Sequence, residues 1–264
     1  MPFPDSPRVI YNKNPLTEVI CQLTFPAILR IDKESPSEYQ EKLREDYPFF
    51  VEQQGANLKL NFPKEFAEVI GNALPIRSGR AIYQFLSSDK KWKITLTRES
   101  LAISTVSYKS WEEFKQHFEK PLSVFIEEYK PAFFSRIGLR YVDIINKSKL
   151  NLQDVSWSEL LKPSIAGELS DSNIAERITH CVNQLTISLD DEGGVILLNH
   201  GLFDDNSNES EKFAYLIDSD FSTEQKTEVQ NAIERLDYFN KYSGRLFRWC
   251  ITEKLHDALE PQSL

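Results

Sequence analysis

The chain has 264 residues, of which 41% are hydrophobic and 27% charged, with only 9 glycines. This composition excludes a collagen and a disordered chain, since burial of 17 Phe, 10 Tyr and 4 Trp side chains can offset the entropy lost on ordering the backbone. The formal net charge of -9 argues against binding to nucleic acid or anionic lipid. Residues 133–264, with 13 basic and 22 acidic side chains, carry this whole excess. An acidic half is typical of either a docking face for a basic partner or simple solubility.

Cysteine use and the chain start favour a cytoplasmic protein without membrane contact. Cys21, Cys181 and Cys250 are far apart, odd in number and without paired spacing, which argues against a disulfide framework. Met1–Pro15 has four prolines and no apolar stretch, so neither a signal peptide nor an anchor is expected. The apolar runs elsewhere are too short to cross a bilayer.

The first half of the chain is predicted to begin with a strand and a helix. Apolar and polar residues alternate over Val19–Phe25, as in a half-buried strand. Ser35, followed by Pro and Glu, predicts a helix start, and Tyr39, Leu43 and Tyr47 form its apolar stripe. The next expected elements are strands at Leu58–Phe62, Ala81–Leu86, Lys91–Thr97 and Leu101–Tyr108, and a short helix at Lys64–Ala73.

A long aromatic helix is predicted to close the first half. Ser110 and Glu113 form a capping box at its start. Large apolar residues follow at spacings of three and four, at Trp111, Phe114, Phe118, Leu122, Phe125 and Tyr129. Pro121 removes one backbone hydrogen bond inside this helix, so a bend is expected there.

After Pro131 a similar order of elements begins again. A strand at Phe133–Asn146 and a helical stretch at Ser156–Ile165 are followed by strands at Asn183–Leu189, Gly193–Phe203 and Glu211–Asp218. Ser222 and Gln225 are predicted to open a helix that runs toward Gly244. A last helix is expected to carry Leu246–Leu259 and to stop at Pro261.

This order predicts an α+β protein of two similar halves, residues 1–132 and 133–264. Each half is expected to be an antiparallel sheet packed on a long helix, and the two halves together allow one compact unit. Periodicity leaves open whether the halves share one continuous sheet.

Three segments of the chain resemble a known protein family. They are YNKNPLTEVICQLTFP (Tyr11–Pro26), RIGLRYVDIIN (Arg136–Asn146) and LFRWCITEKLHDALEP (Leu246–Pro261). The chain is similar through them to a sporadically distributed bacterial and archaeal family of about this length, whose biochemical function is unknown. The resemblance implies a mobile accessory gene, such as one in a defence or toxin–antitoxin locus, and it implies no reaction.

Common enzyme signatures are absent from the sequence, which has no P-loop, G-x-S-x-G, paired C-x-x-C, H-E-x-x-H or EF-hand loop. His180, Cys181 and His200 with Asp204 and Asp205 have the chemistry of zinc ligands. Neighbouring strand residues point to opposite faces, however, so a half-buried cysteine and a surface histidine are favoured. Acidic residues at 190–192 and 204–205 are interpreted as turns. No catalytic residue, metal ligand or cofactor is therefore predicted.

Arg136, Gly138 and Arg140 form the most informative polar pattern, because on a strand the three share one face. Two guanidinium groups about 13 Å apart, with a gap over Gly138 between them, can hold an anionic ligand or admit a partner's backbone. In the alternative interpretation, an aromatic side chain of the long helix fills the gap and the arginines pair with carboxylates. The three residues are the predicted binding site.

The leading hypothesis is a non-catalytic cytoplasmic protein that binds a protein partner, a second copy of itself or a small anionic effector. The absence of enzyme signatures, the acidic second half and the family resemblance motivate it. The alternative is an enzyme of unfamiliar type that acts on a phosphorylated or nucleotide substrate, held by Arg136 and Arg140 in a cleft between the halves.

Overall fold

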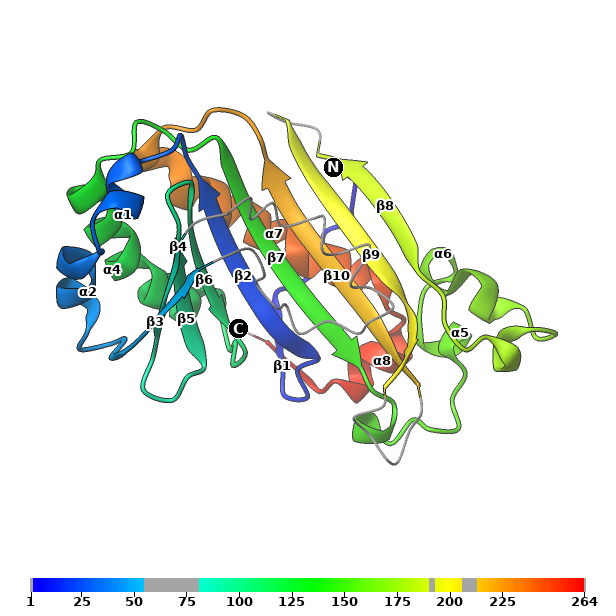
Figure 1. The fold of residues 1–264 in the computed structure, drawn as a ribbon. Coiled ribbons are helices and arrows are strands. Elements are labelled where there is room, and N and C mark those ends of the chain that lie inside the picture. Colours follow the sequence, from blue (N-terminus) through cyan, green and yellow to red (C-terminus); the bar gives the residue numbers. More distant parts are fainter. Residues whose placement is uncertain (1, 55–80, 190–192, 206–212, 264) are drawn as a thin grey trace.

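A nine-stranded antiparallel sheet forms the centre of the protein (Figure 1). The computed structural model describes residues 2–54, 81–189, 193–205 and 213–263. The strand order is β3–β4–β5–β6–β2–β7–β10–β9–β8. The strands are β2 (Leu16–Thr24), β3 (Phe49–Gln54), β4 (Ala81–Leu86), β5 (Trp92–Leu96), β6 (Ser100–Thr105), β7 (Arg136–Ile145), β8 (Asn183–Ser188), β9 (Gly194–Asp204) and β10 (Phe213–Thr223). The strand expected at Leu58–Phe62 and the helix expected at Lys64–Ala73 lie outside the described residues.

Two long helices, α4 and α7, cover one face of this sheet and lie behind it in Figure 1. The α-helices are α1 (Leu29–Lys33), α2 (Ser37–Leu43), α4 (Trp111–Tyr129), α5 (Trp157–Leu160), α6 (Pro163–Ala166), α7 (Ala232–Cys250) and α8 (Glu253–Ala258). Short 3-10 helices span Ser148–Leu150, Gly167–Ser170, Ala175–Arg177 and Val229–Asn231. No helix among the described residues combines the length and apolar character needed to cross a bilayer.

The predicted α+β class is confirmed, and the sheet is continuous across the boundary between the halves. Strand β2 of the first half pairs antiparallel with β7 of the second, from Leu16 opposite Asp143 to Thr24 opposite Arg136. Each half places the first strand that it contributes to this sheet at the centre and pairs it with the last strand of its meander, β2 with β6 and β7 with β10. Residues on both sides of Ala132 therefore share one sheet.

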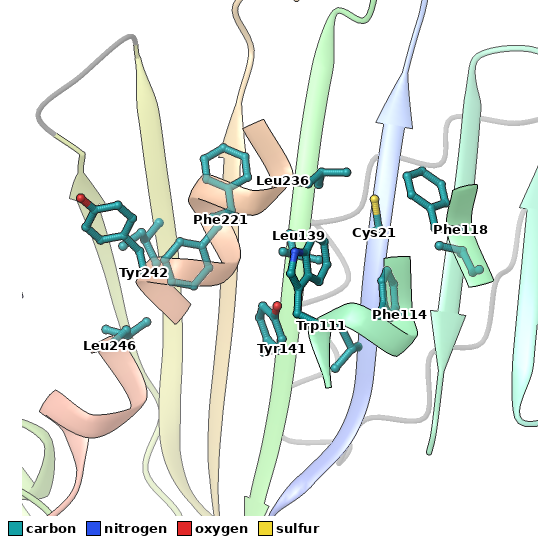
Figure 2. Close-up of a cluster of buried hydrophobic side chains, with 14 of the residues drawn as sticks. Cys21, Trp111, Phe114, Phe118, Leu139, Tyr141, Phe221, Leu236, Tyr242 and Leu246 are labelled. Carbon is teal, nitrogen blue, oxygen red and sulfur yellow. The ribbon is translucent and has the colours of Figure 1, made fainter. Parts of the chain in front are cut away.

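The predicted aromatic helix is confirmed as α4. The Glu113 backbone N–H donates to the Ser110 Oγ at 3.2 Å, so Ser110 is the side-chain N-cap of the helix. Its apolar stripe is buried against the sheet, and Figure 2 shows Trp111, Phe114 and Phe118 on the same side of the strands as Cys21. Buried residues of both halves belong to one hydrophobic core.

The predicted start of the next long helix was wrong. Strand β10 continues through Ser222 to Thr223, because these two residues pair with Gly138 and Ile137 of β7 and with β9. Helix α7 begins only at Ala232. A local capping pattern at Ser222 is thus overridden by two neighbouring strands that hold the backbone extended.

The predicted helix break near Gly244 was also wrong. Helix α7 passes through this glycine to Cys250, and only then does the separate short helix α8 follow. A glycine inside a helix costs about 1 kcal/mol relative to alanine but does not by itself end the helix. Gly244 is exposed, and the space where a Cβ would stand is open.

The two short strands near the termini were not predicted from the sequence. Strand β1 (Val9–Tyr11) pairs antiparallel with β11 (Pro261–Ser263), so the two ends of the chain meet in a two-stranded sheet. Proline was interpreted as a stop signal at position 261, yet it is tolerated at the first residue of a strand. This pairing holds the N-terminal segment beside helix α7.

We expect Gly201→Ala to destabilise the fold, because an added Cβ on β9 would overlap the backbone carbonyl of Cys181. It would also lie 3.2 Å from the Val182 Cα. Backbone atoms in a sheet cannot move away as the end of a flexible side chain can. The expected loss is therefore about 1–3 kcal/mol of unfolding free energy, measured by urea denaturation. Gly244→Ala, where the added methyl meets open space, is the matched control and should not lose stability.

Candidate functional site

A pocket of about 470 Å³ lies on the helix-covered face between α4 and α7. Its floor is formed by side chains of β7 and β10, among them Tyr141, Asp143 and Ser219. Its walls are the segment Tyr108–Trp111 that leads into α4, side chains between Asn240 and Arg248 on α7, and the N-terminal segment 6–11. The volume falls in the range of about 300–1,000 Å³ that is typical of small-molecule sites.

Contacts between distant segments hold these walls in place. The Trp111 indole N–H and the Lys115 ammonium group, both on α4, bind Asp237 Oδ1 on α7, at 2.5 and 2.9 Å. Arg8 in the N-terminal segment makes two hydrogen bonds of 2.7 Å to the Glu112 carboxylate on α4. The pocket is therefore assembled from both halves and from the chain start.

Aromatic rings line the inner part of the pocket. Tyr108 and Tyr141 meet edge to face with centroids 5.9 Å apart, and the Tyr141 hydroxyl donates to Asn240 Oδ1 at 2.9 Å. Burial raises the pKa of both phenols above the ordinary value, so both stay neutral at physiological pH. Figure 2 shows Tyr141 next to Trp111, which also lines the pocket.

Asp143 is the chemically distinctive residue of the floor. Its side chain points to the helix-covered face of β7 and is only 5% exposed. Its carboxyl group forms no hydrogen bond or ion pair with the described residues. Burial, and secondarily the charge of Asp218, raise the pKa of this carboxyl well above the ordinary value. Burial therefore favours the protonated form of Asp143, which presents one O–H donor and one C=O acceptor to the pocket.

The rim of the pocket is basic. Arg8, Lys109, Lys241, Arg245 and Arg248 all line it. Four of them are paired with acids, namely Glu112, Glu113, Asp5 and Glu253 in that order. Lys241 is exposed, and it forms no ion pair with any residue in the part of the chain that the structure describes. An anion at the rim therefore meets chiefly the charge of Lys241.

The predicted site residues lie on the opposite face of the same strand. Arg136 and Arg140 do share one face of β7, and both are buried, at 9% and 1% exposure. Arg140 binds the Asp218 carboxylate through Nε and Nη2 at 2.6 and 2.9 Å, and Arg136 Nη2 binds Asp220 Oδ2 at 2.7 Å. The expected pairing with carboxylates is therefore confirmed.

These two ion pairs belong to two neighbouring hydrogen-bonded groups that together cross the sheet, and we call the two groups the polar ladder. It is made of Gln22, Arg136, Arg140, Gln184, Asn199, Asp218 and Asp220. The Asn199 amide donates to Asp218 at 2.9 Å, and the Gln184 amide donates to Asn199 at 2.8 Å. Two arginines balance two aspartates, so the ladder is formally neutral.

The aromatic filling expected over Gly138 was wrong. Helices α4 and α7 lie on the other face of β7, so neither of them reaches this gap. The guanidinium group of Arg136 occupies it instead, because an added Cβ at Gly138 would lie 3.0 Å from Arg136 Cζ and closer still to one of its nitrogens. Gly138 thus gives Arg136 room to reach Asp220.

The residues considered for zinc take structural roles. His180 is exposed and Cys181 is half-buried, as predicted, although both precede β8 and lie outside any strand. His200 Nδ1 lies 2.7 Å from the Tyr215 hydroxyl, and burial lowers the pKa of this imidazole to about 4. The Cys181 Sγ accepts a hydrogen bond from the Leu202 N–H at 3.4 Å. All three cysteines are free thiols.

Within the described residues, three ligand-type side chains come close together only on α8. These are Glu253, His256 and Asp257, at the protein surface. The Tyr11 hydroxyl already lies 2.8 Å from His256 Nδ1, which gives this ring a structural partner. The cluster therefore provides no argument for a metal centre.

The sequence interpretation missed Asp143 and Gly244, although each carries a local signal. Asp143 is the one charged residue in the run Tyr141–Ile145, which otherwise reads as a buried strand. Gly244 lies inside an amphipathic helix and lines the pocket. An acid in an apolar strand and a glycine in a helix interior both lower the stability of the fold. Their presence at these positions therefore indicates a role other than packing.

Comparison with known proteins gives no matching family model and no match among curated proteins.

Proposed function

We propose that the protein is a non-catalytic binding protein that holds a small anionic effector in the pocket between α4 and α7. The carboxyl group of Asp143 carries this proposal. This side chain is 5% exposed, faces the pocket and forms no hydrogen bond within the described residues, so its carboxyl group is available to hydrogen-bond a bound ligand. The basic rim and the apolar inner walls favour an anion with an apolar body.

Gly244 offers a direct test, because its Cβ position is open and the residue lines the pocket. Gly244→Trp should fill the pocket without clashing with the helix, whereas Gly244→Ala adds one methyl group and leaves the volume nearly unchanged. Both variants should fold at least as stably as the natural chain, since each replaces a glycine in a helix interior.

The measurement is native mass spectrometry after mixing each chain with a small-molecule extract of bacterial cells. A bound compound should be retained by the natural chain and by Gly244→Ala, and lost from Gly244→Trp. Circular dichroism spectra that match among the three chains establish that folding is unchanged. The same compound on Gly244→Trp, or none on the natural chain, would contradict the proposal.

A second candidate is an enzyme acting on a phosphorylated or nucleotide substrate in this cleft. A buried neutral carboxyl facing a pocket is the arrangement of a general acid, and this favours Asp143 for that role. Arg136 and Arg140 face away from the pocket, so the rim cations would hold such a substrate instead. Asp143→Asn separates the two functions, because it should abolish turnover in an enzyme and retain the bound compound in a binding protein.

The broader setting stays a prediction. The free thiols support the expected cytoplasmic location, and the quoted sequence resemblance supports an accessory locus of the defence or toxin–antitoxin kind. A protein partner or a second copy of the chain is tested by sedimentation velocity, with the mass of the monomer as the contrary result. We also infer that the halves 1–132 and 133–264 arose by duplication, which their matching element order supports. Homologous sequences in which one half aligns with the other would test this origin.

A further inference from the structure

The floor of the pocket presents a specific hydrogen-bonding pattern. A neutral carboxyl offers a donor and an acceptor side by side, so its complement is a group with an acceptor next to a donor. Amides and the edges of purine and pyrimidine bases have this pattern. A cationic amine has donors only, so it does not match the donor and acceptor that the protonated carboxyl presents.

The walls beside Asp143 favour a planar ring. Tyr108, Trp111 and Tyr141 line the pocket, and Tyr141 is itself only 5% exposed. Aromatic side chains stack on nucleobases of any sequence, because every base has a π face. A flexible aliphatic ligand would fill the same volume but would leave the Asp143 carboxyl without a partner.

Charge places the other end of the ligand at the rim. The basic side chains Arg8, Lys109 and Lys241 are exposed, whereas Asp143, Tyr141 and Ser219 are buried. Lys241 provides a point charge of the kind that binds phosphate. An anionic ligand would therefore lie with its uncharged end on the floor and its negative group beside Lys241.

We propose that the effector is a mononucleotide. Its base forms hydrogen bonds with the Asp143 carboxyl on the floor, and its phosphate lies at the basic rim near Lys241. This inference rests on the proposed function. A pocket of about 470 Å³ is near the lower end of the range for small-molecule sites, which favours one nucleotide over an oligonucleotide. The base edge and the phosphate make separate contributions, so each can be removed in turn.

The test is isothermal titration calorimetry of the full chain with AMP, GMP, CMP and UMP. Ribose 5-phosphate and the four matching nucleosides, adenosine among them, serve as probes that each lack one end of the ligand. At least one mononucleotide should bind about tenfold or more tightly than either fragment, a difference of about 1.4 kcal/mol. Binding should weaken as salt is added, because the phosphate contact lies at an exposed rim.

Variants at both ends of the pocket complete the test. Asp143→Asn keeps a neutral donor and acceptor and should bind within about threefold of the natural chain, whereas Asp143→Leu should bind at least about tenfold more weakly. Lys241→Ala should weaken a mononucleotide and leave adenosine unchanged. Equal binding by Asp143→Leu, or an effect of Lys241→Ala on adenosine, would count against the assigned orientation.

The possible failures are distinguishable. If no mononucleotide binds while Gly244→Trp still removes some other compound captured from the extract, the nucleotide assignment is wrong and the proposed binding function stands. If the natural chain captures no compound at all, both are wrong.

Discussion

Arg140→Met is expected to lower the free energy of unfolding by about 3–5 kcal/mol. Arg140 is 1% exposed and its partner Asp218 is fully buried, with two hydrogen bonds between them. Methionine keeps much of the apolar stem but removes the charge, so the Asp218 carboxylate stays buried with no cation beside it. Urea denaturation followed by circular dichroism measures the loss.

A double variant distinguishes an unpaired charge from lost packing. Arg140→Met combined with Asp218→Leu removes both charges and should recover much of the stability lost in the single variant. Arg44→Met is the surface control, because its pair with Glu41 is exposed on both sides and should contribute less than about 1 kcal/mol. If Arg140→Met lowered the free energy of unfolding no more than Arg44→Met does, the polar ladder would not stabilise the sheet.

Asp143→Asn is expected to become more stable than the natural chain as the pH rises. Burial raises the pKa of Asp143 in the folded state above its value in the unfolded chain. Below both pKa values the two states carry the same proton and the group has no effect. Above the unfolded value the unfolded chain releases its proton first, so the natural protein loses about 1.4 kcal/mol per pH unit until the folded pKa is passed. Asparagine carries no such proton, so the variant lacks this loss.

The measurement compares unfolding free energies of the two chains between about pH 4 and pH 8. Asp220 and Glu18 also have raised pKa values, so only the difference between the chains isolates Asp143. Asp171→Asn is the control, because hydrogen bonds from Asn173 lower the pKa of that exposed carboxyl and place its titration below this pH range, so its difference from the natural chain should stay nearly constant. A constant difference between the natural chain and Asp143→Asn over this range would mean that Asp143 is ionised in the fold.

Local patterns predicted elements best where they agreed with the tertiary contacts. The capping box at Ser110 and the aromatic spacing behind it predicted α4, because both signals come from the helix itself. The similar pattern at Ser222 failed because β7 and β9 pair with that residue, and no local signal reports a strand partner far along the chain. Gly244 failed as a stop because helix-breaking tendency is weak against the packing of a long amphipathic helix.

The sequence by itself determined the α+β class, most strands, the aromatic helix and the shared face of Arg136 and Arg140, since these follow from periods of two and of three to four residues. The tertiary structure decided which face of β7 the helices cover, and with it that the arginines form a buried ladder while Asp143 faces a pocket. Periodicity tells which side chains share a face, but not what that face meets. Local patterns could not predict the pocket, because its walls come from segments more than 100 residues apart in the chain. These segments come together only when the strands of both halves pair in one sheet.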